Sequence, residues 1–233
     1  MKDLLKKIFL FIILFIIFLY KDLFYLIPLK LLKIDYTKLN DNQELILSLM
    51  ASLVLVIIII IIYRKYLKEK IIDYKNHIEE YFDFGIKYWF MGIIGMAACN
   101  FLISTLSPVH EANNEALVQE MLKNAPLLTF ISASLIAPFV EEMLFRKNFG
   151  DIFKNKKIMV LASGLFFGLL HVIFSINSWW DLLYVFPYGI LGGAFAYILY
   201  KKDNIFIPIT FHIIHNSALT LVSILISNLF KIW

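Results

Sequence analysis

Apolar stretches recur along this chain, and several are long enough to cross a lipid bilayer as a helix. The clearest, 45–63, contains six consecutive isoleucines, and a transmembrane helix needs about 20 mainly apolar residues. Hydrophobic residues make up 61% of the 233 and charged residues 17%, whereas soluble domains have about 45–50% and about 25%. We therefore expect an all-α polytopic transmembrane helix bundle, with no room for a soluble domain of useful size.

Seven spans are expected, or eight if the last apolar stretch is split. Lys21 and Asp22 interrupt the first stretch, so the alternative to one helix over 8–29 is a short span followed by an interfacial helix. The lysines before it resemble the start of a signal peptide, but no small-residue cleavage site follows, which predicts an uncleaved anchor. The expected spans are 8–29, 45–63, 84–106, 125–150, 158–174, 182–200 and 205–230.

Two connectors between these spans carry most of the remaining charge. Residues 64–83 carry charged side chains of both signs and are expected to be a partly helical cytoplasmic segment. Residues 107–124 are expected to be an acidic outer loop, with Glu111, Glu115 and Glu120.

Lysine and arginine are distributed unevenly between the two sides of this arrangement. Cytoplasmic loops of membrane proteins are enriched in Lys and Arg, which predicts a cytoplasmic N-terminus. Arginine is scarce while lysine and isoleucine are frequent, a usage that indicates a low-GC bacterium and its plasma membrane. Because the lysines lie at membrane boundaries, no nucleic-acid partner is expected from the net charge of +4. The basic clusters are Lys2, Lys6 and Lys7, and the segments 64–75, 146–157 and 201–202.

The fourth span carries three ionisable residues within six positions, Glu141, Glu142 and Arg146. Each such residue costs roughly 2.5–3.5 kcal/mol at the centre of a spanning helix, and ionisable residues in spans are commonly functional. Glu142 and Arg146 are four residues apart, in the order that favours an ion pair on one helix face. Glu141 points elsewhere and is the carboxylate expected to be free for chemistry. Pro138 is expected to kink the helix before this motif.

Two later spans carry polar residues at helical spacing. Phe167 and His171 share one face of the fifth span, and His212 and Asn216 share one face of the last. His215, three residues after His212, is expected either to support these residues from beside them or to take no part. Glu141, Glu142, Arg146, His171, His212 and Asn216 are thus the candidate catalytic residues, with Phe167 and His215 as supporting ones.

These residue types suit two hydrolytic chemistries. A carboxylate with a histidine can activate water, while an imidazole and an amide can donate hydrogen bonds to an oxyanion. Alternatively, Glu141, His171 and His212 could hold a divalent metal such as zinc, since two histidines and a glutamate form a common catalytic set. The single cysteine, Cys99, excludes an internal disulfide and a cysteine-based zinc site.

The three motifs, in this order on successive helices, resemble the signature of the CPBP family of CAAX proteases and bacteriocin-processing enzymes, also called Abi. The resemblance covers about 125–217, so that 125–230 would be the protease-like core and 1–124 three N-terminal spans with their connectors, in a single membrane domain. It implies an intramembrane peptidase, either a metalloprotease or a glutamate protease, with a cavity open to the cytoplasm. It further implies that Glu141 and His171 activate water, that His212 and Asn216 stabilise the oxyanion, and that Glu142 and Arg146 support them.

The expected substrate is a hydrophobic or membrane-associated peptide, such as a bacteriocin or signal-peptide precursor, or a bacteriocin in self-immunity. A non-catalytic immunity or scaffold protein of the same fold is the alternative. A proton-coupled transporter is disfavoured because no internal repeat is visible.

Two geometric questions follow from the sequence. Simple helix starts place His171 deeper in the membrane than His212, so the site closes only if the fifth span starts late or is tilted. Gly189, Gly192 and Gly193 could pack within the bundle, the favoured interpretation, or against another copy.

Overall fold

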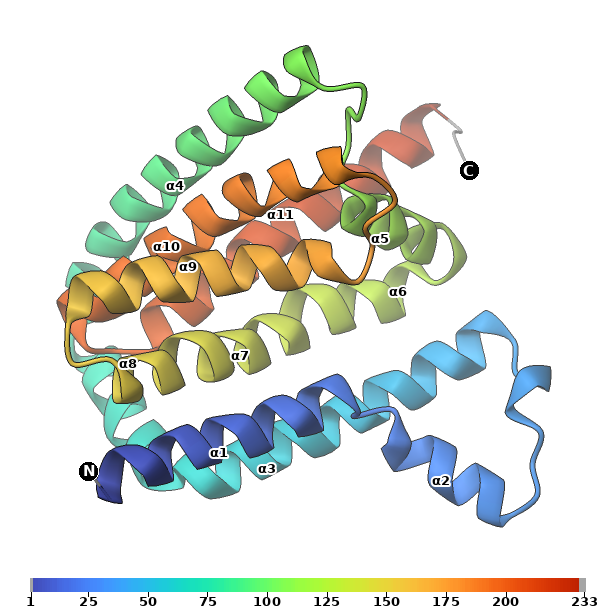
Figure 1. The fold of residues 1–233 in the computed structure, drawn as a ribbon, viewed down its shortest axis with the longest axis horizontal. Helices are drawn as coiled ribbons and strands as arrows, with labels where there is room; N and C mark the ends of the chain where they lie inside the picture. The colour runs from blue at the N-terminus through green and yellow to red at the C-terminus, as the bar shows by residue number, and fades with distance from the viewer. Residues whose placement is uncertain (1, 231–233) are drawn as a thin grey trace.

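The structure, a computed structural model, describes residues 2–230 and leaves 231–233, the predicted outer C-terminus, outside the described part. Every regular element in residues 2–230 is helical (Figure 1). Six helices are long and apolar enough to cross a membrane, or seven if a bent N-terminal pair is one span. The predicted all-α multi-pass bundle is therefore confirmed.

The N-terminal apolar stretch is not one helix, so that prediction was wrong. Helix α1 covers Lys2–Leu19 and α2 covers Leu23–Leu31, and the two are bent by 56°. At the bend, Lys21 Nζ donates to Ser48 Oγ at 2.7 Å, and this hydroxyl donates to Asp22 at 3.1 Å. The polar pair that interrupts the run thus finds its partner on α3, while α2 leaves the bundle with the short helix η1, Tyr36–Lys38 (Figure 1).

The next two helices extend well beyond their apolar stretches. Helix α3 runs from Asp41 to Asn76 and α4 from Ile78 to Leu106, so the connector predicted at 64–83 is helical on both sides of His77. Asn40 and Gln43 form a capping box that fixes the start of α3.

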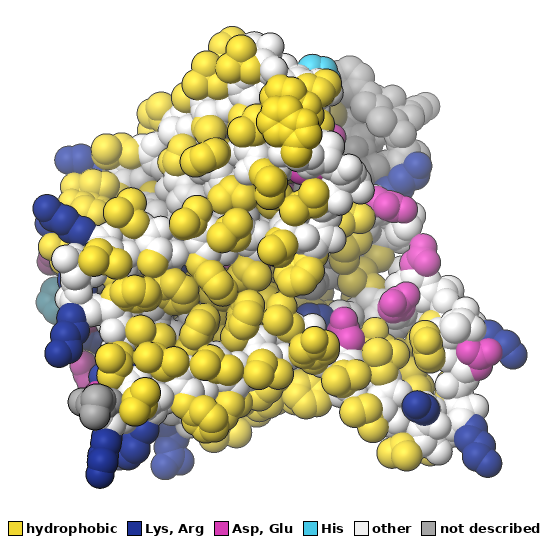
Figure 2. All heavy atoms as spheres, viewed as in Figure 1, with side chains coloured by type: hydrophobic (Ala, Val, Ile, Leu, Met, Phe, Trp, Pro, Cys, Tyr) yellow, Lys and Arg dark blue, Asp and Glu magenta, His cyan; other side chains and the backbone are white. Residues whose placement is uncertain are grey.

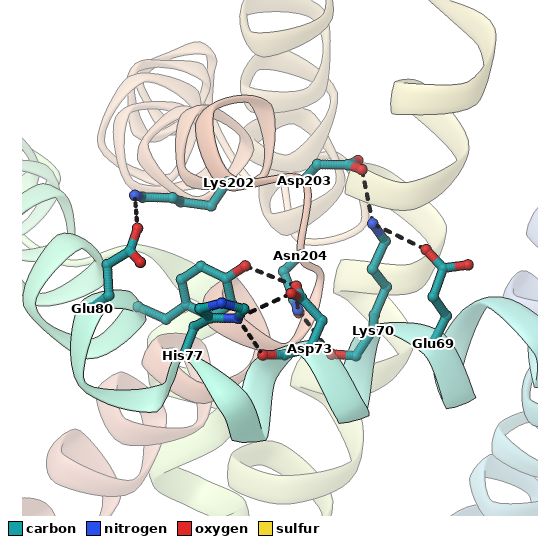
Figure 3. A network of polar contacts seen from close by, with 9 residues as sticks. Glu69, Lys70, Asp73, His77, Glu80, Lys202, Asp203 and Asn204 are labelled. Atoms are coloured by element: carbon teal, nitrogen blue, oxygen red, sulfur yellow. Dashed lines mark hydrogen bonds and ion pairs between the residues drawn. The ribbon is translucent and has the colours of Figure 1, made fainter.

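A polar network joins the end of α3 to the turn between α10, Val185–Lys202, and α11, Phe206–Phe230 (Figure 3). The buried Asn204 donates through Nδ2 to Lys70 O and to Asp73 Oδ2, both at 2.8 Å. Tyr81 of α4 donates to the same Asp73 oxygen at 2.8 Å. Asp203, in the left-handed region with φ of 47°, ends α10. The network therefore fixes where α11 begins, and with it the position of His212.

The acidic loop predicted at 107–124 is largely a helix, α5, over Asn113–Asn124. Leu122 is buried, and Gln119 donates to Ser223 of α11 at 3.0 Å. With only one fully buried side chain, this helix has too little apolar surface to be recognised as part of the bundle.

The fourth span is one long helix, Pro126–Ile152, that contains two π-helical segments. They are η2, Phe130–Ile136, and η3, Glu142–Lys147, and the α-helical pieces between and around them are α6, Pro126–Thr129, α7, Ala137–Glu141, and α8, Asn148–Ile152. Pro138 is the second residue after η2. Single π turns inside α-helices are frequent at functional sites.

The remaining helices are α9, Lys156–Ile173, the 3-10 helix η4, Trp179–Tyr184, α10, Val185–Lys202, and α11, Phe206–Phe230. Helices α9 and α10 approach closely through glycines. A Cβ on Gly164 would lie 2.7 Å from Gly189 O, and one on Gly192 would lie 2.8 Å from Phe167. Packing within the bundle is thus confirmed for Gly189 and Gly192, whereas Gly193 faces open space.

The surface matches a membrane-embedded bundle. Figure 2 shows hydrophobic side chains across the middle of this face, with Lys and Arg mainly at its left and lower right edges. Helices α3, α4 and α9 contribute many exposed large apolar side chains, which lipid would cover.

The contact between α9 and α10 gives a test of the packing. A Cβ at Gly168 would lie 2.2 Å from Val185 O, a backbone atom that cannot turn aside. We expect Gly168→Ala to destabilise the protein by about 1–3 kcal/mol through overpacking, measured as a lower thermal midpoint in detergent.

Gly193→Ala is the matched control, since no atom lies within 4 Å of the added carbon and alanine favours helix by up to about 1 kcal/mol. Equal midpoints for the two variants would contradict the packing described here.

Candidate active site

A buried chain of three charged or polar groups joins the fourth span to α11. Arg146 Nε lies 3.1 Å from Glu142 Oε2, an ion-pair distance without hydrogen-bond geometry, and both side chains are fully buried. Glu142 Oε1 accepts a hydrogen bond from His212 Nδ1 at 2.8 Å. The predicted Glu142–Arg146 pair is therefore present, and its carboxylate also fixes the His212 ring.

The Arg146 guanidinium is held by aromatic rings. Its central carbon lies 4.1 Å from the centre of the Phe167 ring and 5.9 Å from that of Phe195. A Cβ at Gly192 would approach Arg146 Nη2 to 3.2 Å. Cation–π attraction is strongest where water is excluded, so Phe167 stabilises the arginine while Gly192 leaves room for it.

Backbone oxygens around the motif are capped by side chains that the sequence analysis did not single out. Asn148 Nδ2 donates to Met143 O at 2.9 Å, and Ser163 Oγ donates to Phe145 O at 2.7 Å. Tyr63 of α3 donates to Asn148 Oδ1 at 2.6 Å. Ser163 and Tyr63 interrupt apolar stretches, which is the only sequence signal that could have found them.

Asn216 supplies a hydrogen bond that the fourth span lacks near Pro138. In η2 the N–H of Ala137 bonds to Ser132 O, five residues back. By the same spacing Ala133 O would pair with residue 138, but proline has no N–H. Asn216 Nδ2 donates to Ala133 O at 2.8 Å instead. One amide hydrogen is thus occupied, and the second hydrogen and Oδ1 remain available.

The His171 ring is oriented by its own helix. Its Nδ1 lies 3.0 Å from Phe167 O, and since a carbonyl can only accept, Nδ1 carries the hydrogen. The ring stacks on Tyr188 with centroids 4.7 Å apart. A neutral His171 therefore offers the lone pair of Nε2 as a base.

Glu141 lies beside the other end of His212. Its Oε2 is 3.7 Å from His212 Nε2 and makes no hydrogen bond with any described residue. The Glu141 side chain is 15% exposed, against 0% for Glu142. Of the two glutamates, Glu141 is thus the one whose carboxylate is not engaged by a strong partner.

A cavity of about 380 Å³ adjoins these groups. Phe167, His171, His212, His215 and Asn216 line it, whereas the three side chains from the motif at 141–146 lie behind its wall. Only 7% of the His215 surface is exposed, and its ring lies edge-on to Trp89. It makes no hydrogen bond with any described residue. It is therefore a wall residue of the cavity rather than a partner of His212.

The cavity is bounded at one end by His110, Glu111 and α5. The charge distribution assigns this segment to the outer side. The opening of the cavity to the cytoplasm and the orientation of the chain both stay predictions.

The predicted metal set is not gathered at one point. Within residues 2–230, no three His, Cys, Asp or Glu side chains lie close enough to hold one ion. The depth difference expected from the sequence is the reason. Helix α9 does start at Lys156, and the α9 residue beside the His212 ring is Phe167, with centroids 5.8 Å apart. His171 lies one turn farther along α9, with its ring centroid 4.2 Å from that of Phe167.

Comparisons with known proteins point to one family. A family model described as Type II CAAX prenyl endopeptidase Rce1-like matches residues 123–218, which include all three motifs. "UPF0177 protein YxdF" of Lactococcus lactis subsp. lactis is 31% identical over 175 residues, covering 72% of this chain and 88% of that protein. "Putative membrane peptidase YdiL" of Bacillus subtilis is 26% identical over 117 residues, covering 49% of this chain and 44% of YdiL.

A second Lactococcus protein, "UPF0177 protein YvdC", is 28% identical over 134 residues, and the match spans 49% of its length. No solved structure matches. The similarity to YxdF covers most of both chains, and the family model spans the three motifs at 141–146, 167–171 and 212–216. The chain therefore belongs to the CPBP family of Rce1-like intramembrane proteases.

Proposed function

We propose that this protein is an intramembrane endopeptidase that cleaves a hydrophobic or membrane-associated peptide with an activated water. One observation carries the proposal. A free carboxylate, Glu141, faces the Nε2 edge of His212, whose other nitrogen is fixed by the buried Glu142. A fixed imidazole next to an unengaged carboxylate and a cavity is the arrangement that general acid–base hydrolysis needs.

The proposed reaction begins with a water between Glu141 and the cavity. Glu141 takes one proton from this water, aided by the Nε2 lone pair of His171, and the hydroxide attacks the scissile carbonyl carbon. The C–N bond then breaks as the proton passes to the leaving nitrogen. The products are one carboxylic acid and one amine, which balances the water consumed.

The oxyanion of the tetrahedral intermediate would be stabilised from α11. The second amide hydrogen of Asn216 and the Nε2–H of a protonated His212 are the available donors, because both side chains line the cavity. Donors of this kind commonly contribute about 10²–10³ in rate when water is excluded. Glu142 and Arg146 would act by holding His212 in place.

A divalent metal remains compatible with the donor types but not with their arrangement. Glu141, His171 and His212 would be its ligands, and a bound ion would supply the positive charge that activates water. Since they do not converge in this structure, the proposed steps use side chains alone.

The substrate class follows from the setting. The cavity lies inside a bundle whose outer surface is apolar, so a substrate would enter with a hydrophobic segment. Processing of a bacteriocin or signal-peptide precursor, or cleavage of a bacteriocin in self-immunity, fits this description.

The first prediction concerns Glu141. We expect Glu141→Gln to reduce cleavage of a quenched hydrophobic peptide library by about 10²–10⁴ through loss of the general base, and to leave the thermal midpoint close to wild type. His171→Ala, run in parallel, should also lose activity. A chelator arm of the same assay separates metal-dependent from metal-independent cleavage.

Glu120→Gln is the control, because this glutamate is exposed and does not line the cavity. If Glu141→Gln cells keep an immunity or signalling phenotype while wild-type protein cuts nothing, the protein is a scaffold rather than a peptidase.

The second prediction separates the two glutamates. Glu142→Gln removes the only ion-pair partner described for the buried Arg146, and breaking a buried pair typically costs about 3–5 kcal/mol. We expect this variant to unfold at a markedly lower temperature in detergent, in contrast to Glu141→Gln. Equal stability of the two variants would show that Glu142 is not the structural member of the pair.

A further inference from the structure

The cavity continues from the catalytic residues to a second, acidic end. Glu111 and Glu115 line it, and its lining includes no lysine or arginine. Among the described residues, neither carboxylate lies within ion-pair distance of a basic side chain. Two carboxylates thus share one chamber with no lysine or arginine among its described lining residues.

The Glu115 side chain is held in one orientation by a hydrogen bond. Its Oε1 accepts a hydrogen bond from Gln119 at 3.0 Å, and Gln119 also donates to Ser223 of α11 at 3.0 Å. This arrangement ties α5 to α11, and Glu115 Oε2 makes no hydrogen bond to any residue within 2–230. Glu111 is exposed at the end of the cavity. One carboxylate is therefore held at a fixed position inside the chamber and the other lies at its mouth.

An independent feature indicates that the chamber receives a polar ligand. His215 lines the same cavity, is only 7% exposed, and hydrogen-bonds to no described residue. Buried polar groups are normally hydrogen-bonded, so this imidazole lacks a partner that a ligand would supply. The backbone amides of an extended peptide offer such partners.

We propose that this end of the cavity is a specificity subsite for a cationic flank of the peptide substrate. A lysine or arginine next to the hydrophobic segment would pair with Glu115 and Glu111, while the adjoining backbone hydrogen-bonds to His215 and continues to His212 and Asn216. This assignment rests on the proposed peptidase function and adds which peptides the site selects: those in which a basic residue adjoins an apolar stretch.

Peptide binding tests the subsite without relying on turnover. Two fluorescent peptides share one apolar segment and differ only in carrying lysines or glutamines at its end. Their affinities are measured by anisotropy on the full chain in detergent, in a Glu141→Gln background so that neither is cut. Adding Glu111→Gln and Glu115→Gln together should weaken binding of the lysine peptide roughly five- to tenfold, the effect of losing a charge-assisted contact. The glutamine peptide should bind as before.

Glu120→Gln, on the same helix but outside the cavity, is the matched control and should change neither affinity. Higher salt should reduce the preference for the lysine peptide, since exposed charges are screened. The subsite is wrong if the double variant affects both peptides alike, if it affects neither, or if the starting protein shows no preference.

The two proposals fail in distinguishable ways. If wild-type protein does not cleave the glutamine peptide in a Glu141-dependent manner, the peptidase mechanism fails, and a preference for lysine that depends on Glu111 and Glu115 still stands.

Discussion

The buried interaction of Arg146 with Glu142 is the constraint on which the rest of the site depends. An arginine cannot shed its charge in a protein, and unpaired charge in a bundle core is among the costliest defects a fold can contain. Arg146 therefore requires Glu142 on its own helix and the Phe167 ring beneath it. Because Glu142 also binds His212, the requirement for neutrality places the imidazole of α11 against the fourth span, with Glu141 as the carboxylate left over.

The fourth span, Pro126–Ile152, departs from regular α-helical geometry at two places. The π segment at 130–136 and Pro138 leave Ala133 O without its backbone donor, and Asn216 supplies one. Asn148 and Ser163 cap the oxygens of Met143 and Phe145 in the second π segment. Ser163 and Asn216 lie on other helices, and Asn148 in turn accepts a hydrogen bond from Tyr63 of α3. Local irregularity in the backbone is thus converted into contacts between elements, which position the site residues more firmly than apolar packing alone would.

Much of this could be predicted from the sequence, for definable reasons. Apolar length gave the spans, and polar residues inside them, Glu141 to Arg146, His171 and His212 to Asn216, marked the site because such residues are expensive in a membrane. Sequence periodicity could not reveal the π segments, since both are apolar or motif-bearing stretches that also suit an α-helix. Helix α5 was missed because an acidic amphipathic segment resembles a loop. The bend at Lys21 depends on Ser48, a contact between residues 27 positions apart.

The anchoring of α11 is unequal along its length. At its start, Asn204 makes two hydrogen bonds to α3, at Lys70 O and at Asp73. Farther along, the described hydrogen bonds to neighbouring elements are single and spaced apart: from Asn216 to Ala133 O, between Thr220 and Ser134, and from Gln119 to Ser223. A helix that is held more firmly at one end moves about that end, and its displacement grows with distance from it. His212 lies close to the anchoring point at Asn204, whereas the acidic end of the cavity, at Glu111 and Glu115, lies far from it. The bundle could therefore widen to admit a polypeptide while the distance from His212 to Glu142 stays nearly constant.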